Sequence, residues 1–132
     1  MATMKAIATN VGPTIMCAEV RGHSLFTDLP EDKGGFDTAP LPPETLCGAL
    51  ANCIGMVIAI TCREQGIEYA GMTVEVEAEA DDAGNKLDNF EVTIAMPGEL
   101  SEEDRSIVEQ ASTESKVRGT VMSGANVNVT VR

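Results

Sequence analysis

The sequence predicts an α+β fold, because segments with the two-residue period of strands are combined with one long apolar helix and one shorter helix. At 132 residues, the chain is long enough for one domain with its own core and too short for two ordinary ones. We therefore predict a single domain over residues 1–132, with no internal repeat. The expected order is strands, long helix, hairpin, second helix and final strand.

The first part of the chain has the pattern of a hairpin followed by a third strand. Short apolar segments lie on both sides of residues 10–13 (NVGP), which form a typical turn sequence. Residues 23–28 (HSLFTD) are a plausible third strand. The next segment, LPEDKGGFDTAPLPPE, is rich in Gly and Pro and has no period, so we expect a long loop.

A long helix is predicted to begin at Pro42-Pro43 and to end at Gly66. Proline is tolerated in a first helical turn, Glu44 suits the positive end of the helix dipole, and glycine commonly follows the last turn. The middle of the helix is apolar on all sides, which predicts that several neighbours cover it. The uncharged run over residues 45–62 is at the lower limit for a membrane span, and we interpret it as a buried helix of a cytoplasmic protein.

The second half of the chain predicts a hairpin, a helix and a closing strand. Residues 72–80 (MTVEVEAEA) alternate strictly, DDAGNK turns the chain, and LDNFEVTIAM returns as the partner strand. Ser101 opens a second helix, SEEDRSIVEQASTES, with a capping-box pattern. That helix has few apolar positions, so we expect it to be half exposed. Residues 126–131 (NVNVTV) alternate again and predict a final strand.

Charge and composition restrict the possible partners. The formal net charge is −12 with only 9 basic residues, which argues against nucleic acid and against an acidic membrane surface. The possible partners that remain are a small molecule or another protein. The sequence has no Trp and only 3% aromatic residues, so its core must consist of small aliphatic side chains. Such a core in a short chain is easier to stabilise in an oligomer, and we expect an obligate dimer.

Four cysteines are the main candidates for a reactive or metal-binding role, namely Cys17, Cys47, Cys53 and Cys62. On an ideal helix Cys53 and Cys62 point to opposite sides about 13 Å apart along the axis, and Cys47 and Cys53 differ by about 120° and about 9 Å. No pair on this helix can therefore form a disulfide, nor can the three thiols converge on one zinc ion. We expect no metal and no cofactor. Cys17, Cys47 and Cys62 are then interpreted as small buried apolar residues in a reducing compartment.

Residues 34–60 (GGFDTAPLPPETLCGALANCIGMVIAI) resemble the core motif of the OsmC/Ohr family. In that family a loop with Gly-Gly and Asp leads through a proline-rich turn and a Glu into a helix that carries a cysteine. The matching residues are Gly34, Gly35, Asp37, Pro40, Pro42, Glu44, Leu46, Leu50, Cys53, Gly55 and Met56. The chain most resembles the small, less-characterised branch of OsmC-like proteins. The resemblance implies an intertwined homodimer with two central helices per subunit wrapped by antiparallel sheets.

The resemblance also implies a thiol peroxidase activity toward organic hydroperoxides. Cys53 matches the peroxidatic nucleophile of the family. Glu44 matches the glutamate at the junction of loop and helix, and Arg21 is the early arginine that corresponds loosely to the family's arginine. In the family these two residues hold the nucleophile as a thiolate. A small-molecule hydroperoxide would be the substrate.

The sequence departs from the family at the second cysteine. No cysteine follows Cys62, and the family's Cys-x-Val turn at the end of the second helix reads Ser115-Lys116-Val117 here. Because serine cannot form a disulfide, the remaining chemistry is that of one cysteine, in which an external thiol reduces a sulfenic acid at Cys53. Cys17 is the one alternative resolving partner.

Several assignments stay open at this point. Glu44 lies nine residues before Cys53 and faces away from it on a straight helix, so it either meets the partner subunit's site or caps its own helix. Arg21 either supports the thiolate or is an exposed turn residue, and His23 is either a base or structural. The whole protein is either a Cys53-based redox protein or a non-enzymatic protein that binds a small hydrophobic ligand or a protein partner in the dimer cleft.

Overall fold

The computed structural model describes residues 2–132. These residues form two compact units, one up to Leu46 and one from Cys47 onward. The first unit contains a three-stranded sheet, and the second contains a two-stranded sheet and helices, so the predicted α+β class is confirmed. The long helix α1 (Pro42–Gln65) has its first turn in the first unit and the rest in the second.

The N-terminal sheet is an antiparallel meander of β1 (Ile7–Asn10), β2 (Met16–Val20) and β3 (His23–Thr27). The predicted hairpin and third strand are thus confirmed. Arg21 and Gly22, with φ angles of 50° and 83°, form the tight turn between β2 and β3. Positive φ at both central positions matches the twist of the two strands.

The side chain of Asp28 organises the long loop between β3 and α1. It is only 2% exposed, and its carboxylate accepts five hydrogen bonds. The donors are the Thr14 hydroxyl (2.5 Å), the Leu29 N–H (2.8 Å), the Phe36 N–H (3.2 Å), and the Thr38 N–H (3.1 Å) and hydroxyl (2.7 Å). The bond from Thr14 is the largest influence, and together with the bonds from Thr38 and Leu29 it outweighs desolvation and holds the pKa of Asp28 far below its usual value.

The two adjacent glycines of this loop are required for different reasons. Gly34 has a φ angle of 89° and closes the short 3₁₀ helix η1 (Glu31–Lys33) in the left-handed conformation. Gly35 lies against the backbone of Leu29, where a Cβ atom would lie 2.0 Å from the carbonyl oxygen. Both glycines are therefore needed for the loop to adopt this conformation.

Helix α1 begins at Pro42 and is followed by Gly66, as predicted, with a φ angle of 70° at that glycine. A stripe of residues four apart is buried, namely Leu50, Ile54, Ile58 and Cys62. The opposite side is exposed, with Met56 at 65% and Ile60 at 47%. The prediction that neighbours cover the helix on all sides is therefore wrong for the single chain, because only one face of α1 finds packing partners.

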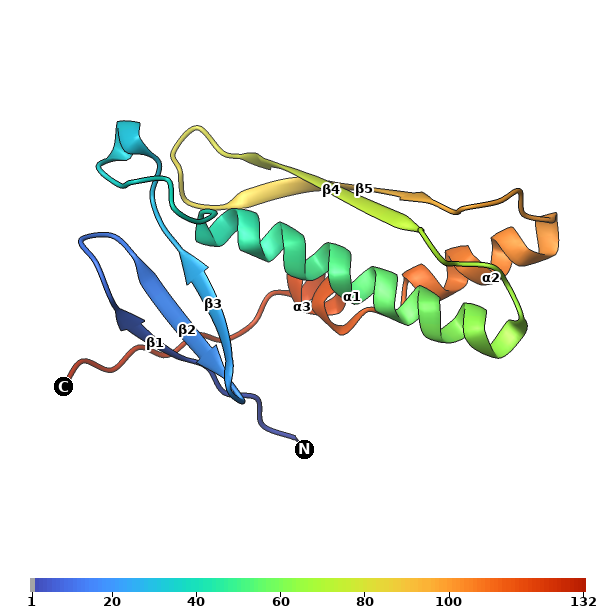
Figure 1. The fold of residues 1–132 in the computed structure, drawn as a ribbon, viewed down its shortest axis with the longest axis horizontal. Helices are drawn as coiled ribbons and strands as arrows, with labels where there is room; N and C mark the ends of the chain where they lie inside the picture. The colour runs from blue at the N-terminus through green and yellow to red at the C-terminus, as the bar shows by residue number, and fades with distance from the viewer. Residues whose placement is uncertain (1) are drawn as a thin grey trace. The chain divides into compact units, whose positions relative to one another are not determined.

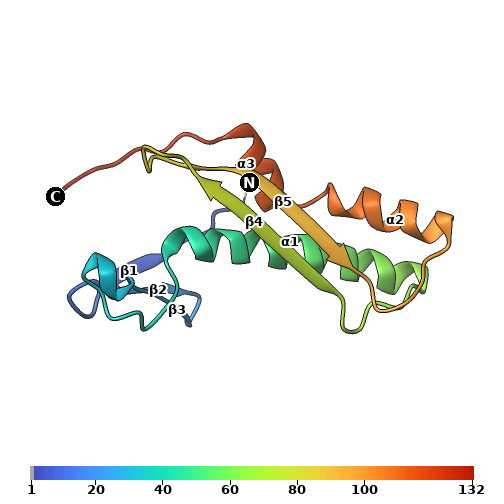
Figure 2. The ribbon, with the colours of Figure 1, turned by 90° about the horizontal axis from the view of Figure 1, so that it is seen from above.

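The buried stripe of α1 packs against a hairpin and two further helices (Figures 1 and 2). The hairpin consists of β4 (Thr73–Ala80) and β5 (Leu87–Ala95), paired antiparallel as predicted. Val74 and Ile94 lie opposite each other and pack on the core, while alternate glutamates of β4 are exposed. Helix α1 is long and apolar enough to span a membrane by length and composition alone, but its buried stripe is the core of this unit.

Helix α2 (Glu102–Ser112) contributes Val108 and Ala111 to the core. Its predicted N-cap, Ser101, accepts a hydrogen bond from the Asp104 N–H at 3.1 Å. A third helix, α3 (Lys116–Ser123), was not predicted. It begins after the N-cap Ser115 and ends at Gly124, which has a φ angle of 72°.

The strand predicted over residues 126–131 is wrong for the single chain. In the described structure this segment has no regular secondary structure. Val127, Val129 and Val131 are 82% to 89% exposed. Alternation favours a strand only where a neighbouring strand completes the hydrogen bonds, and within residues 2–132 no strand pairs with this segment.

The contacts of Asp28 make stability depend on pH. Because folding lowers this pKa, the stabilisation is complete above the unfolded-state pKa near 4 and is lost as the pH falls below it. We expect Asp28→Asn to lower the free energy of unfolding at pH 7 and to flatten the pH dependence of stability below about pH 4. Urea unfolding between pH 7 and pH 3 measures both effects.

The exposed Asp82, in the β4–β5 turn, provides the control for this experiment. Asp82→Asn removes the same charge without removing a network of hydrogen bonds, so its stability should follow the wild type at each pH. An Asp28→Asn variant with the stability and acid sensitivity of Asp82→Asn would contradict the role given to Asp28.

Candidate active site around Cys53

Cys53 lies in the middle of α1, directly before the buried Ile54 and three residues after the buried Leu50. Its own side chain is half-buried. Since its neighbours on the helix are fixed in the core, the thiol has a defined position. It lies near the N-terminus of α3, whose first residues influence the pKa of its thiol.

The first turn of α3 surrounds the sulfur with donors. The Ser115 hydroxyl and the backbone N–H groups of Lys116 and Val117 lie close enough to the Cys53 thiol to lower its pKa. The Ser115 oxygen itself accepts the N–H of Arg118 at 3.1 Å. The N–H groups at the start of a helix have no partner inside the helix. Here the Ser115 hydroxyl satisfies one of them, the N–H of Arg118.

These surroundings favour the ionised thiol. Partial burial is the largest single influence and raises the pKa of Cys53, but the opposing influences together outweigh it. They are the hydrogen bonds from Ser115, Val117 and Lys116 and the positive charge of Lys116, and the net effect is a lowered pKa. The first turn of α3 also contains no acidic side chain that would oppose the charge. A thiolate is the reactive form of cysteine.

The other cysteines lack such surroundings, and all four are free thiols. Cys62 is completely buried, and its burial and the charge of Asp104 raise the pKa of its thiol. Cys47 is half-buried in α1, and Cys17 is buried in β2. The described residues contain no group of three His, Cys, Asp or Glu side chains that could hold a metal ion.

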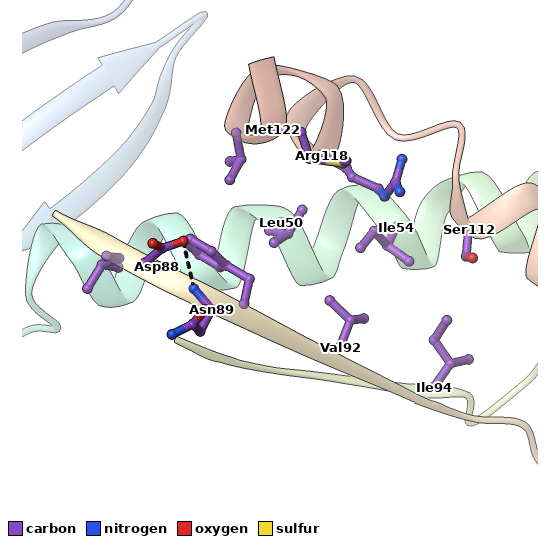
Figure 3. A pocket seen from close by; sticks show the side chains of 12 residues that line it. Leu50, Ile54, Asp88, Asn89, Val92, Ile94, Ser112, Arg118 and Met122 are labelled. Carbon is purple, nitrogen blue, oxygen red and sulfur yellow. Dashed lines mark hydrogen bonds between the residues drawn. The ribbon is translucent and has the colours of Figure 1, made fainter. Parts of the chain in front are cut away.

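A cavity of about 520 Å³ lies between α1, β5 and α3, and neither Cys53 nor Ser115 is among the residues that line it (Figure 3). Leu50 and Ile54, the neighbours of Cys53 in α1, form one wall, and Ser112 and Arg118, on either side of Ser115, form another. The remaining lining residues come from the hairpin and the end of α3. They are Leu87, Asp88, Asn89, Phe90, Val92, Ile94, Val121 and Met122.

Arg118 is the cation in the wall of this cavity. Figure 3 shows its side chain extending from α3 above α1, on the side of Ile54. Its guanidinium donates to the Thr113 carbonyl at 3.3 Å. Within the described part of the chain the one ion pair joins Lys86 and Asp88, so the charge of Arg118 has no carboxylate partner.

The structure brings together two of the predicted site residues, Cys53 and Ser115. Glu44 makes a capping contact, because its carboxylate accepts the Leu41 N–H at 2.8 Å. Arg21 lies in the β2–β3 turn, and His23 is exposed at the start of β3. These three residues belong to the N-terminal unit, and their roles in the chemistry of Cys53 stay predictions.

Sequence reasoning missed the donors that α3 supplies. Lys116, Val117 and Arg118 had no assigned function, because the segment after Ser115 was not recognised as a helix. The available signal was a serine at the N-cap position followed nine residues later by Gly124, which is the usual arrangement of helix ends. The short length of α3 made this signal weak.

The contrast between the cysteines predicts selective labelling. Cys53 should react with a limiting amount of iodoacetamide at neutral pH well before Cys62, because reactivity follows the thiolate fraction and access. Peptide mass mapping measures the ratio. Labelling of unfolded protein provides the control, in which all four cysteines should react at similar rates. Preferential labelling of Cys62 or Cys47 in the native protein would overturn the assignment.

Comparisons with known proteins agree with this fold. A family model described as OsmC-like protein matches residues 35–130. No curated protein sequence matches the chain. A proposed osmotic stress induced and detoxification response protein from Psychrobacter arcticus 273-4 has a similar structure, with 23% identity, a TM-score of 0.81 and coverage of 91% of this chain and 89% of that chain.

Two other similar structures are named for peroxide resistance. An organic hydroperoxide resistance protein from Elizabethkingia anophelis has 20% identity, a TM-score of 0.66 and coverage of 91% and 89% of the two chains. The organic hydroperoxide resistance protein OsmC from Legionella pneumophila, also described as a predicted redox protein, has 21% identity, a TM-score of 0.61 and coverage of 93% and 91%. At these identities the similarity establishes the fold. The match of the family model over most of the chain establishes that this protein belongs to the OsmC-like protein family.

Proposed function

We propose that the protein is a one-cysteine organic hydroperoxide reductase in which Cys53 is the peroxide-reacting thiol. The observation that carries this proposal is the position of the Cys53 sulfur at the N-terminus of α3, where three donors favour its ionised form. The names of the Elizabethkingia and Legionella proteins support the choice of organic hydroperoxides as the substrate class. A mainly apolar cavity, lined in part by Leu50 and Ile54 from the same helix as Cys53, offers room for an organic group.

The proposed reaction has three steps. The Cys53 thiolate attacks the terminal oxygen of the hydroperoxide, the O–O bond breaks, and the products are a Cys53 sulfenic acid and an alkoxide that takes a proton from water. An external thiol then condenses with the sulfenic acid, giving a mixed disulfide and water. A second external thiolate attacks this disulfide, which releases the Cys53 thiolate and an oxidised external disulfide.

An external thiol is needed because Cys47 and Cys62, the other cysteines of the C-terminal unit, lie too far from Cys53 along α1 to form a disulfide with it. Ser115 is the side chain that meets Cys53, and serine cannot form a disulfide. Cys62 is fully buried in the core stripe of α1. Such chemistry requires a reducing compartment, and we place the protein in the cytoplasm, where thiols stay free. Support of the thiolate by Arg21 and Glu44 is a further part of the proposal, added to the donors of α3.

A second candidate function is non-enzymatic binding of a small hydrophobic ligand. The cavity between α1, β5 and α3 supports it, because its lining is mainly apolar and includes the unpaired cation of Arg118. A ligand with an apolar body and one anionic group would suit these walls. Under this alternative Cys53 is inert toward peroxides, so a test of its oxidation separates the two functions.

We also propose that the protein is an obligate homodimer. The support is the exposed side of α1, where Met56 and Ile60 present apolar surface to solvent. The exposed valines of residues 126–131 add a second apolar segment. A chain with so few aromatic residues gains stability when a second copy covers such surface.

Oxidation of Cys53 is the direct test of the proposed enzyme. Treatment with an organic hydroperoxide should convert Cys53 to a sulfenic acid that persists and is trapped by dimedone, because no neighbouring thiol consumes it. Excess peroxide should carry it to the sulfinic acid. Intact-protein and peptide mass spectrometry follow both products, and Cys53→Ser provides the unreactive control. A Cys53 that stays unmodified would favour the ligand-binding alternative.

A Ser115→Cys variant tests the contact between the two helices. Because Ser115 lies close enough to Cys53 to influence the pKa of its thiol, the new thiol should form a disulfide with Cys53 after one peroxide addition. The dimedone adduct should then disappear, and turnover with a dithiol reductant should increase. Rapid disulfide formation in the wild type would instead reveal a resolving partner that we did not assign, with Cys17 the first candidate.

The dimer is tested by light scattering. We expect a mass of about twice 13.9 kDa for the wild type at micromolar concentration. Ile60→Glu should shift the protein toward the monomer, because it places a charge on the exposed apolar side of α1. Ala83→Glu, in the exposed β4–β5 turn, adds the same charge elsewhere and should leave the dimer intact. A stable wild-type monomer would contradict the proposal.

A further inference from the structure

We propose that the cavity between α1, β5 and α3 binds an amphipathic monocarboxylate, whose carboxylate pairs with the Arg118 guanidinium and whose aliphatic chain lies against the apolar walls. The inference rests on the ligand binding given above as the second candidate function and deepens it, since it names the ligand class and the residue that selects it. It does not depend on the reactivity of Cys53. All the lining residues belong to the C-terminal unit, so one chain supplies the whole site.

The size and the lining of the cavity suit the aliphatic part of such a ligand. Its volume of about 520 Å³ lies within the range of about 300–1,000 Å³ that is typical of small-molecule sites. Most of the lining side chains are apolar, and they come from α1, β5 and α3. An aliphatic chain between these three elements would be removed from water on several sides, which is the main driving force for binding an apolar group.

Three of the polar side chains in the lining already have partners. Asp88 forms an ion pair with Lys86 at 3.4 Å and accepts the backbone N–H of Asn89 at 2.9 Å. The side-chain amide of Asn89 donates to the Glu79 carboxylate at 3.2 Å. The Ser112 hydroxyl donates to a carbonyl of its own helix at 2.6 Å. The chain itself therefore satisfies these three groups, and a ligand is not needed to pair them.

Arg118 is the polar lining residue that keeps spare donors. A guanidinium has five N–H groups, and the one hydrogen bond that this side chain forms within residues 2–132 goes to the Thr113 carbonyl at 3.3 Å. The side chain is half-buried. Figure 3 shows it on the side of Ile54 and Ser112, away from Asp88. Because a guanidinium can donate two parallel hydrogen bonds to one carboxylate, a carboxylate is the group that fits it best.

The overall charge of the protein does not explain a preference for a carboxylate. The formal net charge is −12, which repels anions at long range. Exposed charges more than about 10 Å away are largely screened at 0.1 M salt, so the charge in the cavity wall acts on a bound ligand more strongly than distant charges do. A carboxylate that binds more tightly than a neutral ligand of the same length therefore reports the contact with Arg118.

The test compares octanoate with 1-octanol by isothermal titration calorimetry of the full-length protein. We expect octanoate to bind about tenfold more tightly, because a hydrogen bond to a charged group is stronger than a neutral one. Arg118→Gln should weaken octanoate binding about tenfold and leave the affinity for octanol unchanged. Arg105→Gln is the matched control, because it removes the same charge from an exposed position of α2 outside the cavity. It should leave both affinities unchanged.

Three outcomes overturn the proposal. They are equal affinities of the wild type for octanoate and octanol, no binding of octanoate at millimolar concentration, and an equal loss of octanoate binding in Arg105→Gln. If Arg118→Gln fails to fold in a thermal unfolding measurement, Arg118→Lys decides. Lysine keeps the charge but lacks the paired donors, so octanoate should bind severalfold more weakly and octanol equally well. An unchanged affinity for octanoate in folded Arg118→Lys overturns the proposal as well.

Failure here is distinguishable from failure of the proposed functions. Equal binding of octanol and octanoate would refute the selection of a carboxylate and leave the binding of a hydrophobic ligand intact. Oxidation of Cys53 is measured separately and needs neither probe. A Cys53 that forms the sulfenic acid in a protein that does not bind octanoate would refute this inference and leave the proposed reductase intact.

Discussion

The C-terminal unit depends on the packing of one stripe of α1. Leu50, Ile54, Ile58 and Cys62 recur every four residues and bury one side of the helix against the hairpin β4–β5 and the helix α2. Each fully buried aliphatic side chain contributes about 1.5–3 kcal/mol relative to its exposure. Because a helix is rigid, this packing also fixes the direction in which every other side chain of α1 leaves the helix. The position of the half-buried Cys53 follows from it without any further constraint.

The same packing gives the thiol its chemistry. A helix terminus acts on a charge only over the distance of its first turn, so α3 influences Cys53 only while α1 and α3 keep their contact. Val117, whose N–H lowers the pKa of Cys53, also packs against the core through its side chain. One residue therefore links the core to the site. A substitution that loosens the core near Val117 is expected to change reactivity as well as stability.

Sequence reasoning succeeded where a signal was local. The bounds of α1 follow from Pro42 and Gly66, and the hairpin follows from the alternation of β4. The facing of Cys53 and Ser115 came from the family resemblance, not from spacing. Local patterns could not reveal the Asp28 contacts, because Thr14 and Thr38 lie far from it along the chain. The strand predicted over residues 126–131 is not formed in the single chain, because a strand needs a neighbouring strand to complete its hydrogen bonds.

The contact between Cys53 and α3 joins ionisation to folding. The folded-state pKa of Cys53 is lowered, so the thiolate stabilises the fold, and the free energy of unfolding increases with pH up to the unfolded-state value near 8.5. By thermodynamic reciprocity, any molecule that binds and orders α3 also promotes deprotonation of the thiol, and any modification that removes the negative charge of the sulfur loosens the helix. The ionisation and the chemical modification of the Cys53 sulfur are thus coupled to the structural order of the segment that follows Ser115.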